Sequence, residues 1–310
     1  MPTFCRHNRF VENCPICREP EPAAKPVSRA RRPASSGGAR TGAMTVRRAQ
    51  RSADDGYRTR LAPGLRATAD GARLAQEIGF AAARLELLAG DPPGLYAEVA
   101  READSEEAIW LAFLIAYLGP VEDAQPFAAI AAARTSWASG ELPALEGVAG
   151  GPRGAQDDER GPRALLAYRD WARRTGGQAA GLAGEPYWSA ERRFARDFER
   201  LALPGLHRAA RFDFLTVLGA TGRVELRAAS LFLGDDRTTL AAKRVFGIGD
   251  TLLLDRRARS LAEACDVPLA ALDLALFNWQ DEDARATLGV PATEEASEAA
   301  QRAHDALGTA

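Results

Sequence analysis

Apolar residues recur at helical spacing along most of the chain beyond residue 60, and they predict a series of helices. The first predicted helix has its apolar positions between Ala72 and Leu88 and ends at Gly90, just before an Asp-Pro-Pro-Gly turn. Val and Ile are sparse and never alternate with polar residues over a useful length, so no strand is expected. The pattern therefore predicts an all-α body.

A second predicted helix opens at Asp104, where acidic residues suit the positive end of a helix dipole. From Trp110 to Leu118 it is apolar nearly all round, so we expect it at the centre of the core. Gly119 and Pro120 then stop it. Further helices are predicted at residues 126–137, 162–174 and 187–201, and the Gly/Pro-rich residues 139–161 are predicted to form an exposed loop.

The stretch Thr238–Trp279 is a predicted helix, a Gly-Ile-Gly break, an arginine-rich helix and a third helix that starts at Pro268. Lys243 lies just before the break and is the only lysine after residue 25. Because arginine supplies every other cation in this part of the chain, the retained lysine is a candidate for a functional role.

Charge is distributed unevenly along the chain. Residues 1–60 carry 13 basic and 5 acidic side chains, which leaves 27 and 37 for the rest of a chain whose net charge is −2. The basic segment predicts either contact with a polyanion or a solubilising tail. The chain has no apolar run of about 18 residues and no signal-peptide core at its start, so we expect no membrane partner. The expected location is the cytoplasm, with association with the nucleoid as the alternative.

Residues 1–18 predict a small zinc knuckle. Cys5, His7, Cys14 and Cys17 supply the four ligands that tetrahedral Zn²⁺ prefers, and the last two form a Cys-x-x-Cys turn. Four protein ligands leave no open position for a catalytic water, so the zinc would be structural. The alternative is a set of reduced surface cysteines beside an unrelated histidine.

Residues 19–62 are rich in Pro, Ala, Ser, Gly and Arg and lack apolar periodicity, so we expect a disordered basic linker. The predicted organisation is therefore a knuckle at 1–18, this linker at 19–62, a helical domain at 63–283 and a C-terminal helix or tail at 284–310.

Leu203-Pro-Gly-Leu-His-Arg resembles the turn of helix-hairpin-helix DNA glycosylases, in which backbone amides bind a DNA phosphate. The resemblance implies phosphate contacts for Gly205, His207 and Arg208. His207 replaces the second glycine of that motif, Ala209 stands where lyase-type members carry lysine, and Arg227 lies near where an Asp is expected. On the alternative interpretation the sequence is an ordinary turn between helices.

Three segments together resemble the alpha-glutamyl/putrescinyl thymine pyrophosphorylase family, which has a DNA-glycosylase-like helical fold. They are Glu106–Pro120, Arg211–Gly219 and Lys243–Trp279, and the resemblance covers roughly residues 65–280. It implies DNA as a partner and a reaction in which an amine replaces pyrophosphate on a hydroxymethyl pyrimidine.

Candidate roles follow from the chemistry of that reaction. Departing pyrophosphate needs cations, for which Lys243, Arg244, Arg256 and Arg257 are available. The incoming small amine needs a proton acceptor, and a flipped base needs an aromatic partner. The candidate acceptors are Asp250, Asp255 and Asp273, which with Lys243 form the catalytic set; the candidate stacking residues are Trp279, Phe277 and Tyr117.

Structural interpretations of the same residues remain open. Asp250 and Asp255 are suitable as helix caps. Arg256 and Arg257 are compatible with a solvated helix face. Phe277 and Trp279 are compatible with the hydrophobic core. The sequence therefore leaves three functions in competition: DNA base hypermodification, a non-catalytic DNA-binding module, and a DNA glycosylase with altered chemistry.

Overall fold

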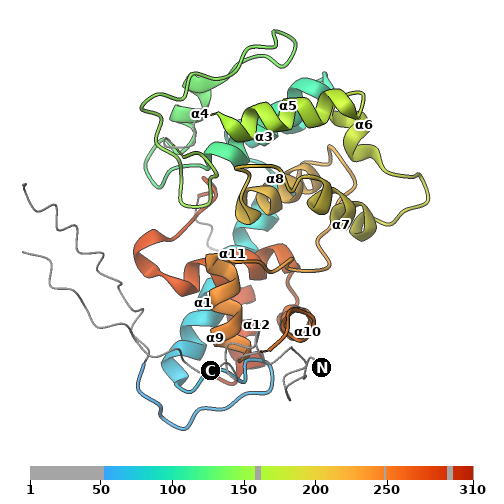
Figure 1. Cartoon of the computed structure of the whole chain (residues 1–310). Helices are drawn as coiled ribbons and strands as arrows, with labels where there is room; N and C mark the ends of the chain where they lie inside the picture. Colours follow the sequence, from blue (N-terminus) through green and yellow to red (C-terminus); the bar gives the residue numbers. More distant parts are fainter. Residues whose placement is uncertain (1–51, 158–161, 248, 292–295, 310) are drawn as a thin grey trace, which may run out of the picture. The chain divides into compact units, whose positions relative to one another are not determined.

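The computed structural model describes residues 52–157, 162–247, 249–291 and 296–309, all within one compact unit that runs from residue 48 to 310. Within these ranges every regular element is helical, as the sequence predicts (Figure 1). The elements are α1 (Thr68–Gly90), α2 (Leu95–Arg101), α3 (Ser105–Leu118), α4 (Ala128–Ala133), α5 (Arg163–Arg174), α6 (Gln178–Ala183), α7 (Ala190–Arg200), α8 (Arg208–Ala220), α9 (Arg237–Phe246), α10 (Thr251–Cys265), α11 (Leu269–Gln280), a 3-10 turn η2 (Glu282–Ala284) and α12 (Ala296–Leu307).

Helix α3 is the centre of one group of helices, drawn in the upper part of Figure 1. The Asp104 side chain caps it by accepting hydrogen bonds from the Glu106 and Glu107 N–H groups at 2.8 and 3.4 Å. Every residue from 108 to 118 is buried, which confirms the expected central position. The Phe113 ring stacks on Tyr168 of α5 with 3.6 Å between centroids.

Helix α11 has the same role in a second group, formed with α1, α9, α10 and α12 (Figure 1). Its residues from 271 to 279 are all buried, and α1 packs mainly on α11 and α12. Gly79 of α1 allows the close approach of α12, because a Cβ there would lie 2.5 Å from the Cβ of Ala300.

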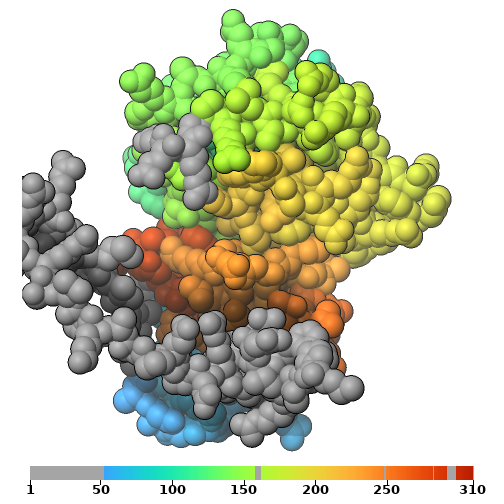
Figure 2. Space-filling model, in the orientation of Figure 1, coloured from blue at the N-terminus to red at the C-terminus, as the bar shows by residue number. Residues whose placement is uncertain are grey.

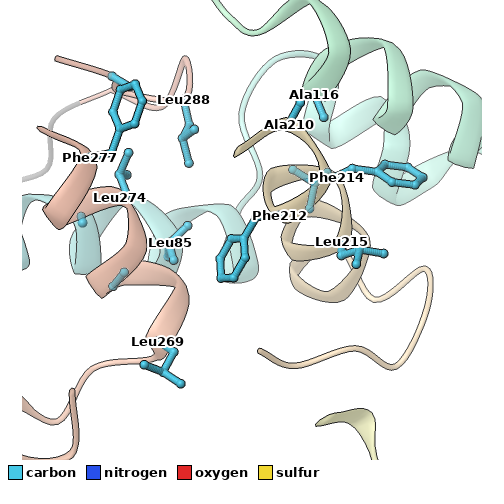
Figure 3. Packing of buried hydrophobic residues seen from close by; sticks show 14 of the residues in the cluster. Leu85, Ala116, Ala210, Phe212, Phe214, Leu215, Leu269, Leu274, Phe277 and Leu288 are labelled. Carbon is cyan, nitrogen blue, oxygen red and sulfur yellow. The ribbon is translucent and has the colours of Figure 1, made fainter. Parts of the chain in front are cut away.

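Helix α8 lies between the two groups. Phe212 and Phe214 leave opposite sides of it, and Figure 3 shows Phe212 turned toward Leu85 of α1 while Phe214 points away. Phe214 meets Phe113 edge to face at 5.5 Å, and Phe212 meets Phe194 of α7 at 5.4 Å. One helix thus links both hydrophobic centres.

Two predictions about local structure were wrong in extent. The helix expected at residues 126–137 is only the six-residue α4, and the short α2 and α6 were not predicted. The Glu107 carboxylate explains the early end, because it accepts hydrogen bonds from the N–H groups of Trp137 and Ala138 at 2.9 and 3.1 Å. These bonds hold residues 136–138 in a turn instead of a helix.

The exposed loop predicted at residues 139–161 is also partly wrong. Its described part folds back onto the end of α3, where the Ala155 N–H donates to the Tyr117 carbonyl at 2.7 Å. Arg153 is only 4% exposed. Small residues permit this close contact, since a Cβ on Gly154 would lie 2.2 Å from the Leu118 carbonyl oxygen.

No helix in the described ranges is long and apolar enough to cross a membrane. The predicted knuckle and residues 19–51 of the predicted linker lie outside these ranges.

Candidate nucleic-acid interface

Helix α7 packs on the body through two phenylalanines. Ser189 caps the helix by accepting a hydrogen bond from the Arg192 N–H at 3.3 Å. Phe194 and Phe198 are buried, with ring centroids 5.4 and 6.4 Å from that of Phe212 in α8. Because these rings fix the inward side of α7, its opposite side is turned outward.

Three arginines occupy that outer side at a spacing of four residues. Arg192 and Arg200 are exposed, and the Arg196 side chain keeps 25% of its surface. Four residues of α-helix rise about 6 Å, so the three side chains form a stripe along the helix axis. We call Arg192, Arg196, Arg200 and the adjacent Trp188 the arginine face. The helix and the segment before it form the yellow-green right edge of the surface in Figure 2.

Trp188 holds two of these cations in place. The guanidinium carbons of Arg192 and Arg196 lie 4.5 and 5.4 Å from its ring centroid. Stacking on an aromatic ring orients a guanidinium and leaves its edge available to an anion. Part of the Arg196 edge is already used, because its Nη1 donates to the Gly181 carbonyl at 3.2 Å and to Asp197 at 2.9 Å. The neighbouring Tyr187 is 79% exposed, so a second aromatic side chain borders the face.

Acidic groups partly offset the charge of this face. Glu199 is exposed on the same side of α7, and Arg196 forms an ion pair with Asp197 at 2.9 Å. Burial raises the pKa of Asp197 to about 7, against the effect of Arg196. Asp197 is thus largely neutral at pH 6, and Arg196 then carries an uncompensated charge.

The turn Leu201–His207 joins the end of α7 to the start of α8. The Leu206 N–H donates to the Leu203 carbonyl at 3.1 Å, and Gly205 has a φ of +82°, which favours glycine. His207 precedes α8 and is exposed, and its side chain makes no capping hydrogen bond. The first-turn amides of α8 follow His207 directly, and they have no acceptor within the helix.

Arg208 is directed inward from the start of α8. Its guanidinium forms ion pairs with Asp273 of α11 and, at 3.3 Å, with Asp236, and it donates to the Leu231 carbonyl. Its side chain is 5% exposed, whereas that of Asp273 is fully buried. In this structure Arg208 therefore positions α8 and does not reach the surface as a phosphate ligand.

Asp273 also pairs with Arg153, which comes from the loop that follows α4. The Nη2 atom of Arg153 lies 2.6 Å from a carboxylate oxygen of Asp273 and also 2.6 Å from a carboxylate oxygen of Asp213. Although burial favours the neutral acid, Arg208 and Arg153 hold the pKa of Asp273 below its usual value. Asp273 is thus an ionised partner of two arginines, and no proton acceptor for an external amine.

The cations predicted around the Gly-Ile-Gly break are spread over different environments. Lys243 and Arg256 are exposed. Arg244 donates to Gln280 at 3.0 Å and stacks over Trp279 at 4.8 Å, while Arg257 donates to the carbonyl of residue 246. Arg244 and Arg257 therefore serve the packing of α9 against its neighbours.

The two other predicted carboxylates have structural partners. Asp250 caps α10 by accepting a hydrogen bond from the Leu253 N–H at 2.7 Å. Asp255 accepts hydrogen bonds from the Ser230 hydroxyl and the Leu231 N–H, both at 2.8 Å. The structural interpretation given for Asp250 is the one observed.

The predicted stacking residues belong to the core. Tyr117, Phe277 and Trp279 are 1%, 4% and 1% exposed. Trp279 donates its indole N–H to the Asp70 carbonyl at 3.1 Å. None of the three presents an open ring face to a base in this structure.

Among the described residues no group of His, Cys, Asp and Glu is placed to hold a metal ion. The predicted zinc ligands Cys5, His7, Cys14 and Cys17 lie outside the described ranges.

Sequence reasoning missed the arginine face, although its signal was available. Arg192, Arg196 and Arg200 follow one another at i, i+4 and i+8 inside a segment that was predicted to be helical. Arg153 offered no such signal, because it lies in a Gly/Pro-rich segment without periodicity.

No protein-family model, curated protein or solved structure matches this chain.

Proposed function

We propose that the helical body binds duplex DNA through the arginine face and the adjoining Leu201–His207 turn. The observation that carries the proposal is the continuity of three arginines on the outer side of α7 with a glycine turn and with the exposed His207 that precedes α8. Arginine guanidinium groups and helix N-termini both bind phosphate oxygens. The likeness of the turn to a glycosylase hairpin supports DNA as the polyanion.

Such contacts would be made to the backbone and would carry little sequence information. The body beyond residue 60 is acidic overall, so a local concentration of cations matters more than net charge. The buried ion pairs of Arg208 support the proposal indirectly, because they fix the start of α8 before DNA arrives. A preorganised turn loses little conformational entropy on binding.

Replacing all three arginines tests this proposal. In the full-length chain, Arg192→Ala/Arg196→Ala/Arg200→Ala is expected to weaken binding to a fluorescent 20-base-pair duplex by about tenfold or more at moderate salt. Loss of three phosphate contacts would also reduce the slope of log Kd against log salt concentration by between about two and three. Fluorescence anisotropy at several NaCl concentrations measures both quantities.

A matched triple variant controls for the loss of charge alone. Arg58, Arg60 and Arg66 are exposed and lie before α1, away from α7. Their replacement by Ala should leave the Kd within about threefold, because general charge effects are screened beyond about 10 Å. Equal weakening by both triple variants would refute the assignment, and so would unchanged binding by the first. Tighter binding of RNA than of the duplex would overturn the choice of DNA.

The same assay should show a pH dependence that originates at α7. Protonation of Asp197 below about pH 7 frees Arg196, so the wild type is expected to bind more tightly at pH 6 than at pH 8. The triple variant lacks Arg196 and should lose most of this difference.

The resemblance to the pyrophosphorylase family supports base modification as a second function for the bound DNA. Lys243 is the specific observation in its favour, because the only lysine of the body is exposed on α9 and forms no ion pair among the described residues. In the proposed reaction the amine nitrogen bonds to the exocyclic methylene carbon, while the bond between that carbon and the pyrophosphate oxygen breaks. The amine also loses a proton, which passes to water or to the released pyrophosphate, and a cation near the departing oxygens lowers the barrier.

Lys243→Ala separates these two functions. With pyrophosphorylated hydroxymethyl-pyrimidine DNA and an amine, we expect the variant to retain DNA affinity and to lose turnover, measured by nucleoside mass spectrometry. Lys243→Arg keeps the charge and should recover part of the rate if the group acts as a cation. Absence of any turnover in the wild type would leave binding alone as the function.

A further inference from the structure

A recess lies beside the C-terminal half of α1 and shares no residue with the arginine face. It is an open cleft of about 780 Å³, a size typical of small-molecule sites. Its walls come from α1, from the residues after α3, from the glycine loop before Arg153 and from the segment after α11. The lining residues used below are Phe80, Arg84, Glu122, Asp283, Arg285 and Thr287.

Phe80 is held between two guanidinium groups in this cleft. The Cζ atoms of Arg84 and Arg285 lie 3.3 and 3.4 Å from its ring centroid. Two groups at that height cannot share one side of a ring, so they lie on opposite faces. Like charges this close repel each other, and the arrangement therefore needs negative charge nearby.

Among the described residues, Arg285 forms an ion pair, whereas Arg84 has Glu122 and Glu77 near enough to raise its pKa but forms no ion pair with either. Arg285 pairs with Glu77 of α1 at 3.2 Å. Arg84 is 4% exposed, and its Nη1 donates to the Phe80 carbonyl of its own helix at 3.1 Å, but its Nε is buried without a hydrogen-bond partner. Burial and the neighbouring Arg285 lower the pKa of Arg84 to about 10, so it stays charged at neutral pH. A buried, charged donor without a partner is costly unless a ligand satisfies it.

The geometry of Arg84 favours a carboxylate. Nη1 is already used, which leaves the edge formed by Nε and Nη2, and that edge binds a carboxylate through two parallel hydrogen bonds. Glu122 and Asp283 add negative charge to the cleft, which disfavours a doubly charged phosphate and favours hydrogen-bond donors on the rest of a ligand.

The cleft is held open by contacts of its own walls. Glu122 accepts a hydrogen bond from the Thr287 N–H at 2.8 Å. Asn278 of α11 exchanges hydrogen bonds with Ala286, at 2.8 Å to its N–H and 3.0 Å to its carbonyl. The segment that carries Arg285 is therefore fixed by partners on two other elements.

We propose that this cleft binds a small hydroxy acid, a monoanion whose carboxylate is held by Arg84 and whose hydroxyl groups face the acidic side chains. This inference does not depend on DNA binding at α7.

Glycerate, propionate and inorganic phosphate are suitable probes. Titrated into the full-length chain at up to about 10 mM, glycerate is expected to raise Tm by about 2 °C or more, as a ligand selective for the folded state does. Propionate lacks the hydroxyl groups and should bind several-fold more weakly, and phosphate should give the smallest shift. Isothermal titration calorimetry gives the corresponding dissociation constants.

Arg84→Met tests the role of the guanidinium. Methionine fills a similar volume without charge, so the variant is expected to fold, and the shift with glycerate should disappear. Arg211→Met is the matched control. Arg211 also has a buried Nε without a partner and stacks on a ring at 4.3 Å, but it lies on α8 and does not line this cleft.

The outcomes separate the alternatives. Loss of the glycerate effect in Arg84→Met together with its retention in Arg211→Met supports the proposal. No effect on the wild type, or an equal effect on Arg84→Met, overturns it. Binding of phosphate as tight as that of glycerate would overturn the assignment to a carboxylate.

Discussion

Asp273→Asn is expected to lower the free energy of unfolding by about 3–5 kcal/mol, because it removes one partner of a buried ion pair. The Asp273 side chain has no exposed surface, and its oxygens are paired with Arg153 and Arg208. The amide would leave both guanidinium groups with one fewer negative partner and would point an N–H group at one of them. Urea denaturation followed by circular dichroism measures the change.

A surface pair provides the comparison for this variant. Glu191 and Arg227 also form an ion pair, but their side chains are 31% and 70% exposed. Glu191→Gln should therefore cost less than about 1 kcal/mol. If Asp273→Asn proves as mild as this control, the buried network is not what links α8 to α11.

Gly154→Ala is expected to destabilise the body by about 2–4 kcal/mol, at the upper end of overpacking effects. The added Cβ would lie 2.2 Å from the Leu118 carbonyl oxygen and 2.6 Å from its carbon. Both are backbone atoms at the end of α3, so the loop itself must move. Movement of the loop would also withdraw Arg153 from its two carboxylates.

Thermal or urea denaturation of Gly154→Ala should therefore show coupling to Asp273→Asn. Because both changes disturb the contacts of Arg153, the double variant is expected to lose less stability than the sum of the single variants. Gly90→Ala is a suitable control, since nothing lies within 4 Å of a Cβ at the end of α1. It should be neutral or slightly stabilising, and strict additivity of the other two changes would contradict the coupling.

The sequence predicted the parts of the fold that depend on local pattern. The all-round apolar character of residues 110–118 indicated a central helix, and the break before Asp250 separates α9 from α10 as expected. These features are encoded by residues close together in the chain. The same holds for the capping role of Asp250.

The parts that depend on distant residues were not predictable in this way. Arg153 and Asp273 are 120 residues apart, and nothing in either neighbourhood indicates that they meet. Asp273 was expected to take part in chemistry because it was an available carboxylate, yet the fold uses it to neutralise two buried cations. The cleft around Arg84 was not predictable for a similar reason. Arg84 stacks on Phe80 of its own helix, but Arg285 reaches the other face of that ring only because the segment after α11 returns to α1.

The inward anchoring of Arg208 has a consequence for how the molecule opens. Arg208, the first residue after the turn, is tied to α11 and to the Leu231 carbonyl of the segment between α8 and α9. The rest of α8 fills the space between the two hydrophobic centres. Fraying at this helix start would expose an ion pair that water cannot reach in the folded chain. The backbone amides beyond the first turn of α8 should therefore exchange with deuterium only when the whole body unfolds.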